Sequence, residues 1–198
     1  MDKGKEIYNR KKSITSITDT LFSQQEIFPN IRVWNAETPN TYTLVVSTFD
    51  AQGKPLESFT HLFGFRTVEM RNGMQMINGK AVLFKGVNRH EHDPHKGRTI
   101  SVASMIHDIQ LMKQFNLNGV RNCHYPNYSA WYELCTEFGL YMVDEANIES
   151  HGMMDHKDGT LANYPDWELH FMERMSRMIA RDRNYSAIVT WSMGNESG

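Results

Sequence analysis

The spacing of apolar side chains first follows the period of a β-strand. Apolar residues occupy every second position from 42 to 46, which is typical of a strand. Turn-forming residues follow at 50–54, and residues 56–65 would return as an antiparallel strand. Asn-Gly pairs at 72–73 and 78–79 favour two more hairpin turns. The pattern therefore predicts antiparallel hairpins in this first part of the chain.

Short apolar strands then alternate with stretches of helical period. Strands are expected at 82–87, 119–122, 140–143 and 188–191. Between successive strands, apolar residues recur at helical spacing on one face. The order β-α-β-α-β-α-β implies one parallel sheet whose crossovers are right-handed.

The three expected helices have readable ends. Ser101 can cap the first helix with its hydroxyl, and Gly139 suits the position after the second. Pro165 and Asp166 would lead into the third. Its methionines at 172, 175 and 178 are expected to fill a core rather than to bind a metal. The apolar stripes are Met105, Ile106, Ile109 and Met112; Trp131, Leu134, Cys135 and Phe138; and Leu169, Met172, Met175 and Ile179.

Composition supports a boundary in the sixties, giving domains at 1–65 and 66–198. Twelve of the 13 methionines lie at or after Met70, and eight of the nine histidines lie at or after His90. A formal net charge of −2 argues against a nucleic-acid partner, and the longest apolar stretches are too short to span a membrane. No signal peptide is readable, so we expect a cytoplasmic protein whose N-terminus is truncated inside a hairpin.

Polar clusters follow each of the four expected parallel strands. They occupy residues 88–93, 121–127, 144–152 and 195–198. The carboxyl ends of parallel strands form the active face of β/α folds, so these clusters would converge there. His90, with His92 and His95, matches no zinc template, and Cys123 and Cys135 are expected to be packing residues.

Two of these clusters contain candidates for a metal site. Glu149 and His151 are two residues apart, so both side chains would point the same way on an extended segment. With Glu196 as a third donor, the set suits Mg²⁺ or Mn²⁺ better than a structural zinc. The alternative is a hydrogen-bonded pair of Glu149 with His151.

Glu196 is also the best single candidate for acid/base chemistry. It follows an apolar strand, and desolvation by neighbouring aromatic residues would help a carboxyl group to donate a proton near neutrality. A nearby cation would act in the opposite direction. The alternative is a buried salt bridge between Glu196 and Arg121.

The clusters and their strands form ordered motifs that resemble a known family. The chain is similar to the β-galactosidases of glycoside hydrolase family 2, of the bacterial lactose-cleaving type. The resemblance implies an α/β fold: the first half of a (β/α)8 TIM barrel, preceded by part of an all-β immunoglobulin-like sandwich. A departure at 184–186, where the family usually has Asn-His-Pro, is expected to affect loop shape rather than chemistry. The motifs are residues 86–94, 120–127, 143–152 and 191–198, with 33–34, 39–42 and 64–66 upstream.

Roles for individual residues follow from the resemblance alone. It implies that Glu196 is the general acid/base and that Glu149, His151 and Glu196 hold an active-site Mg²⁺. It further implies that a monovalent cation site lies outside this chain and that the full-length protein is a homo-oligomer. Arg121 is implied to hold the nucleophile. The implied substrate contacts are His90, His124, Asn195 and His151.

The expected function is retaining hydrolysis of terminal β-D-galactosides such as lactose. In the family the nucleophile lies on a later barrel strand, beyond residue 198, so this chain is expected to be an inactive fragment by itself. A second hypothesis is a non-catalytic module that pairs its open sheet edges with a complementing chain. A third is an unrelated metal-dependent hydrolase that uses only Glu149, His151 and Glu196.

Overall fold

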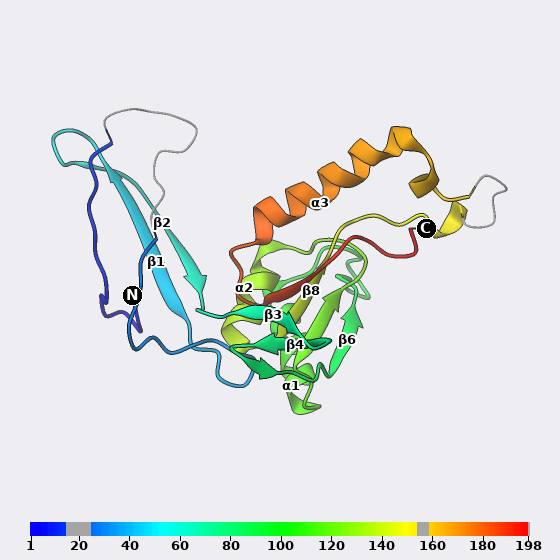
Figure 1. Cartoon of the computed structure of the whole chain (residues 1–198), viewed down its shortest axis with the longest axis horizontal. Coiled ribbons are helices and arrows are strands. Elements are labelled where there is room, and N and C mark those ends of the chain that lie inside the picture. Colours follow the sequence, from blue (N-terminus) through cyan, green and yellow to red (C-terminus); the bar gives the residue numbers. More distant parts are fainter. Residues whose placement is uncertain (15–24, 154–158, 198) are drawn as a thin grey trace.

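The computed structural model describes residues 1–14, 25–153 and 159–197, so Gly198, at the end of the last motif, lies outside it. Figure 1 shows a long β-hairpin beside a smaller antiparallel sheet and a parallel sheet with its helices. None of the helices in these ranges is long and apolar enough to cross a membrane.

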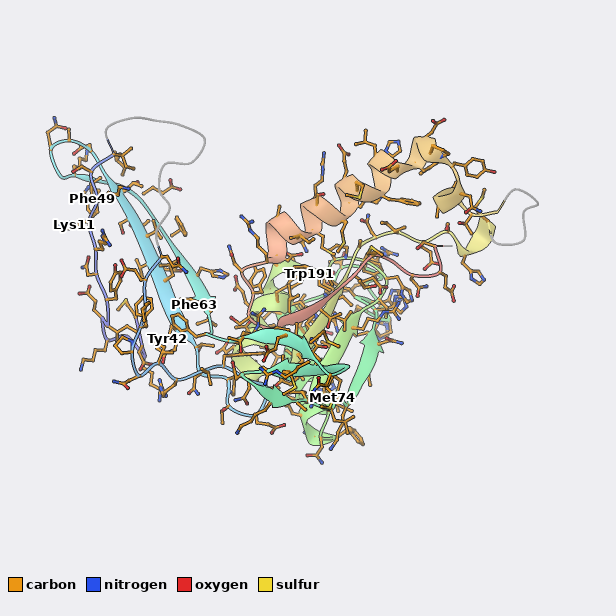
Figure 2. All side chains as sticks on the ribbon, in the orientation of Figure 1. Lys11, Tyr42, Phe49, Phe63, Met74 and Trp191 are labelled. Carbon is orange, nitrogen blue, oxygen red and sulfur yellow. The ribbon has the colours of Figure 1, made fainter. Side chains whose placement is uncertain are left out.

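The first strands form the predicted antiparallel hairpin. β1 (Tyr42–Phe49) pairs with β2 (Pro55–Phe63), which ends two residues earlier than the pattern suggested. Tyr42 is buried at one end of the hairpin, with its ring 6.3 Å from that of Phe63. Phe49, at the far end in Figure 2, is exposed. The hairpin agrees with one part of an immunoglobulin-like sandwich. Among the described residues, this part of the chain forms only this one pair of strands.

A three-stranded antiparallel sheet follows. It consists of β3 (Val68–Arg71), β4 (Met74–Ile77) and β5 (Lys80–Ala81). Its turns are the two Asn-Gly pairs at 72–73 and 78–79, whose φ angles are 52° and 75° in both. Positive φ at both central residues is the type I′ geometry that Asn-Gly favours, so both turn predictions are confirmed.

Four parallel strands and three crossover helices form the largest part of the structure. The sheet order follows the chain order and every neighbouring pair is parallel, which agrees with the first half of a (β/α)8 barrel. In the described ranges the first and last strands each keep one edge without a strand partner. The elements are β6 (Gly86–Arg89), α1 (Val102–Gln114), β7 (Gly119–Asn122), α2 (Ser129–Phe138), β8 (Tyr141–Glu145), α3 (Glu168–Asp182) and β9 (Ile188–Ser192).

The strand predicted at 82–87 is displaced toward the C-terminus. The strand begins only at Gly86, and the side chain of Asn118 is hydrogen-bonded to the backbone before it. Its Oδ1 accepts from the Lys85 amide at 2.7 Å, and its Nδ2 donates to the Leu83 carbonyl at 3.0 Å. The Lys85 carbonyl also accepts from the Asn118 amide at 2.8 Å, so Asn118 bonds this segment through both its side chain and its backbone.

Both helix-end predictions are confirmed. The Ser101 hydroxyl accepts a hydrogen bond from the Ser104 amide at 3.1 Å and caps α1. Gly139 ends α2 with a φ of 76°. A Cβ on Gly139 would lie 2.5 Å from the carbonyl oxygen of Ala36, so both the backbone and the packing require glycine there.

The apolar stripe of α3 is only partly a core. Met178 is buried beside Ile148, and Met175 packs against the same cluster. Leu169 and Met172 are 66% and 58% exposed, which contradicts the core role predicted for Met172. Phe171, in the first turn of α3, is half-buried against the same cluster, so the face that packs contains Phe171, Met175 and Met178, and Met172 lies outside it. Figure 1 shows the C-terminal end of α3 nearest the sheet.

A buried tryptophan joins the N-terminal segment to the barrel half. Trp34 has no exposed surface, and its Nε1 donates to the Thr136 carbonyl of α2 at 2.7 Å. Gly64 lies directly on this indole, where an added Cβ would be 2.3 Å from the Trp34 Cβ. The Gly64 amide also donates to the Ser186 hydroxyl at 2.6 Å. Ser186, in the departure from the family pattern, therefore serves packing between the two parts.

Candidate functional site

A buried carboxylate lies at the centre of the strand-end clusters. Glu145, the last residue of β8, has no exposed surface. Its two oxygens accept from Nε and Nη2 of Arg121 at 2.7 and 2.9 Å, and from the Ser192 hydroxyl at 2.7 Å. Nδ1 of His124 lies 2.8 Å from the same carboxylate. β7, β8 and β9 thus meet in one charged network, as the polar clusters predicted.

The charge state of Glu145 follows from this geometry. Burial by itself raises the pKa of the carboxyl, but hydrogen bonds from Arg121, Ser192 and His124 outweigh burial and hold the pKa below its ordinary value. The group is therefore an anion at neutral pH. It is fully engaged by its donors and is not a free base.

The network continues from Arg121 toward the last strand. Nη2 of Arg121 donates to Asn195 Oδ1 at 2.8 Å, and Asn195 Nδ2 donates to Glu149 Oε2 at 2.8 Å. A parallel bridge between Glu149 and Asn195 aligns their backbones. Arg121, Asn195 and Glu149 are therefore brought together as a linked set.

Glu196 and His151 form a separate pair at the outer edge of the site. Nδ1 of His151 lies 2.6 Å from Glu196 Oε2. Neither alternative contact suggested by the sequence is formed: Arg121 binds Glu145, and Glu149 accepts from Asn195. The Glu196 side chain is 52% exposed, so the expected desolvation is not observed. Glu196 lies four residues beyond the end of β9, at an exposed position.

The predicted Mg²⁺ donors fit that ion in kind, but they are not gathered around one point. Two carboxylates and one imidazole, open to water, match the oxygen-rich ligation that Mg²⁺ and Mn²⁺ prefer. The ligand atoms of Glu149, His151 and Glu196 do not all lie within 4.8 Å of one another, although all three residues are described. A cation held by all three would have to open the contact between His151 and Glu196.

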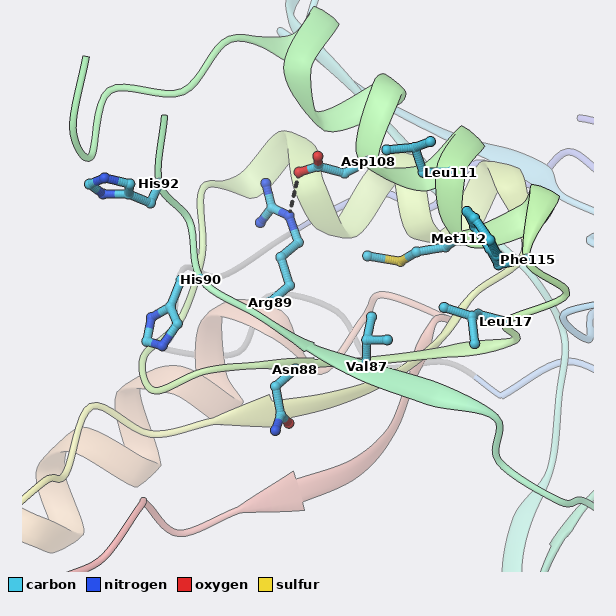
Figure 3. Close-up of a pocket in the computed structure, with 10 residues that line it drawn as sticks. All are labelled: Val87, Asn88, Arg89, His90, His92, Asp108, Leu111, Met112, Phe115 and Leu117. Carbon is cyan, nitrogen blue, oxygen red and sulfur yellow. Dashed lines mark hydrogen bonds and ion pairs between the residues drawn. The ribbon is translucent and has the colours of Figure 1, made fainter. Parts of the chain in front are cut away.

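His90 packs against His124. The two imidazole rings are edge to face with centroids 5.2 Å apart, and the Tyr125 ring is 6.1 Å from His90. Figure 3 shows His90 and His92 at one end of a groove of about 380 Å³ that runs between β6 and α1. The groove reaches the Glu145 network at Asn88, whose Oδ1 accepts from Arg121 Nη1 at 3.4 Å.

Reasoning from the sequence assigned no role to Glu145, Asp144 or Ser192. One signal was available: two acidic residues end the apolar strand at 144–145, so one must face each side of the sheet. Asp144 faces the helices. Tyr132 and Asn122 both donate to its Oδ1, at 2.9 and 3.1 Å.

The second oxygen of Asp144 has an acidic neighbour. Among the described residues no donor reaches Asp144 Oδ2, and the charge of Asp182 acts on the same carboxyl group. Burial, together with the charge of Asp182, raises the pKa of Asp144 to about 7. Asp182 is itself paired with Arg181 at 2.6 Å. A proton held between the two carboxyls would satisfy the unpaired oxygen.

This buried proton predicts a pH-dependent stability. The folded pKa of Asp144 lies above its ordinary value of 3.8, so the folded chain binds the extra proton between those values. The free energy of unfolding should therefore fall as pH rises from about 5 to about 8, by 1 kcal/mol or more. Asp144→Asn should remove most of that slope, as measured by urea unfolding at both pH values.

An exposed carboxyl provides the control for this prediction. Asp166→Asn changes the same functional group at an exposed position and should keep the wild-type slope. An equal slope in wild type and Asp144→Asn would contradict the assignment of the buried proton.

Comparison with known proteins gives a consistent match along the chain. "Glycosyl hydrolases family 2, TIM barrel domain" matches residues 68–198, and "Glycosyl hydrolases family 2" matches residues 1–66. The chain is 53% identical over 165 residues to a β-galactosidase of Pseudoalteromonas haloplanktis, covering 83% of this chain and 16% of that protein. It is 49% identical over 180 residues to a β-galactosidase of Alteromonas mediterranea, covering 91% and 17%.

A solved structure shares the fold at lower identity. A β-glucuronidase from Ruminococcus gnavus, in complex with D-glucaro 1,5-lactone, aligns with a TM-score of 0.76 at 28% identity. The alignment covers 85% of this chain and 28% of that one. Because a family match extends over 68–198 and includes all four parallel strands, the chain belongs to glycoside hydrolase family 2.

Proposed function

We propose that this chain carries the acid/base side of the active site of a retaining β-galactosidase. The observation that supports this most directly is the network at the ends of β7, β8 and β9, in which Arg121 donates to Glu145 and Asn195, and His124 Nδ1 lies 2.8 Å from Glu145. The identity of about half to proteins named β-galactosidase supports the choice of sugar. The chain spans 16–17% of the length of those relatives, so the activity is proposed for the full-length protein.

Glu196 is proposed as the general acid/base. It would protonate the glycosidic oxygen as the leaving group departs, and would then remove a proton from the attacking water. The open position of Glu196 leaves room for a sugar oxygen to reach its carboxyl group. Its present partner, His151 Nδ1, is a donor that can hold the carboxyl in one orientation between the two steps.

The Glu145 network would bind and orient rather than react. Glu145 fixes both the Arg121 guanidinium and the His124 ring, so their remaining hydrogen-bonding groups point in set directions. His90, His124, Asn195 and His151 are proposed to contact the sugar. A retaining pair needs carboxyl groups roughly 5–5.5 Å apart, and we assign the nucleophile to a residue outside this chain, held by Arg121.

The substrate class is tested with two matched glycosides. The full-length protein should hydrolyse nitrophenyl β-D-galactoside with retention of anomeric configuration, observed by NMR. It should favour that substrate over nitrophenyl β-D-glucuronide by at least about 10²-fold in kcat/KM, because a site built for a C6 hydroxyl leaves a carboxylate unpaired. Preference for the glucuronide would reject the galactosidase assignment, and an inverted product would reject the retaining mechanism.

We also propose that Glu149, His151 and Glu196 hold Mg²⁺ in the full-length enzyme. When bound, the ion would supply positive charge beside the acid/base carboxyl. Glu149→Gln should weaken Mg²⁺ affinity by about tenfold or more, measured by titration calorimetry on the full-length protein. Glu137→Gln, an exposed glutamate on α2, should bind Mg²⁺ like wild type. Unchanged affinity in Glu149→Gln would exclude Glu149 as a ligand.

A further inference from the structure

A second group of potential metal ligands includes two of the proposed sugar contacts, His90 and His124. Ligand atoms of His90, Cys123 and His124 all lie within 4.8 Å of one another. Within the part of the chain that the structure describes, no other group of at least three His, Cys, Asp or Glu side chains meets that distance. Cys123 is buried, His124 is half-buried and His90 is exposed, so the set opens toward solvent on the His90 side.

The network around Glu145 already holds one of these ligands in place. The Glu145 carboxylate is 2.8 Å from His124 Nδ1, and Arg121 Nη2 is 3.2 Å from the same atom. A carboxylate on one imidazole nitrogen fixes the ring orientation and makes the other nitrogen a better metal donor. No described residue is hydrogen-bonded to Nε2 of His124, which is the atom left for a metal.

We propose that His90, Cys123 and His124 form a site for a thiophilic divalent metal such as Zn²⁺ or Co²⁺. One thiolate and two imidazoles are softer donors than the carboxylates of the proposed Mg²⁺ site, so the two sites select different ions. Three protein ligands leave a fourth position for water, as in open zinc sites. The metal displaces the Cys123 proton to solvent when it binds, and no redox change is involved.

The consequence for the enzyme follows from the shared residues. His90 and His124 are also proposed to contact the sugar, so a metal held by both would compete with substrate in the full-length protein. This consequence rests on the proposed function, whereas metal binding itself is tested on the 198-residue chain without any activity.

Cobalt is the probe, because a thiolate ligand gives Co²⁺ a charge-transfer band that carboxylate and imidazole ligands do not. Titration of the reduced chain with Co²⁺ should produce this band with one equivalent of metal, and Zn²⁺ should abolish it whereas Mg²⁺ should not. Cys123→Ser, which keeps the side-chain shape, should remove the band. His90→Asn, at an exposed position, should weaken binding by about tenfold or more.

The other cysteine provides the matched control. Cys135 is also a free, buried thiol, but it lies on α2 outside the group, so Cys135→Ser should keep the band. Far-ultraviolet circular dichroism checks that each variant is folded. Absence of the band in wild type, or its persistence in Cys123→Ser, would overturn the site. Unchanged affinity in His90→Asn would overturn the three-ligand assignment.

Discussion

Glu196→Gln is expected to lower kcat of the full-length protein on nitrophenyl β-D-galactoside by about 10²–10⁴-fold. Glutamine keeps the size and the hydrogen-bonding shape of the side chain but can neither protonate the departing oxygen nor take a proton from water. Stability should change little, because the side chain is 52% exposed and does not contribute to a packed core. Initial-rate kinetics on the purified variant measure the effect.

Comparing substrates with different leaving groups distinguishes acid catalysis from other roles of Glu196. A dinitrophenyl leaving group is a weak base that departs without protonation, so formation of the glycosyl-enzyme should be far less sensitive to the substitution. Glu137→Gln, exposed on α2, should retain wild-type kcat on both substrates. If the rate of glycosyl-enzyme formation fell equally for both leaving groups, Glu196 would bind or orient the substrate rather than donate a proton.

Glu145→Gln is expected to lower the free energy of unfolding of the chain by about 3 kcal/mol. The substitution removes the negative charge that pairs with Arg121 and leaves a single amide oxygen to accept from Arg121, Ser192 and His124. Loss of one partner of a buried pair costs about 3–5 kcal/mol, and the lower end applies because Arg121 is 28% exposed. Urea unfolding of the 198-residue chain provides the measurement.

The pH dependence gives this second prediction an independent check. The pKa of Glu145 is lowered in the folded chain, so its stabilising contribution is present above the ordinary value of 4.5 and is lost as pH falls through the folded pKa. Wild type should therefore lose stability in acid more steeply than Glu145→Gln. Glu137→Gln should follow wild type, and a Glu145→Gln variant as stable as wild type would contradict the structural role of the network.

Asp144, which precedes Glu145 on β8, has the opposite effect on how stability changes with pH. Its raised pKa stabilises the folded chain below about pH 7, whereas Glu145 stabilises it above the acid range. The two residues are neighbours in sequence, yet one faces the helices and an acidic partner, and the other faces Arg121. Their charge states differ because the two side chains face opposite sides of the sheet and have different neighbours there, and not because of residue type.

Local patterns predicted the elements whose stability is itself local. The Asn-Gly turns formed because those two residues accept positive φ with little steric cost, whatever surrounds them. The Ser101 cap and the Gly139 helix end are likewise satisfied within a few residues. The order of strands and helices was sufficient to predict a parallel sheet, since right-handed crossovers leave few other arrangements.

Other expectations failed where a distant segment decided the outcome. The backbone of Leu83 and Lys85 is hydrogen-bonded to the side chain of Asn118, more than 30 residues away, and the apolar pattern at 82–87 does not indicate that contact. Met172 is exposed because α3 packs through a face that contains Phe171, Met175 and Met178, although the predicted stripe through Met172 has the period of a core helix. A stripe shows which face can be buried and not whether a partner reaches it.

For the site, the sequence by itself determined which residues end the strands, and therefore which side chains could meet at one edge of a parallel sheet. Only the tertiary structure decided the pairs. It joined Arg121 to Glu145 rather than to Glu196, and His151 to Glu196 rather than to Glu149. It also gathered His90, Cys123 and His124. Which side chains pair depends on distances of a few ångströms between segments of the chain. The spacing of residues in the sequence does not reveal those distances.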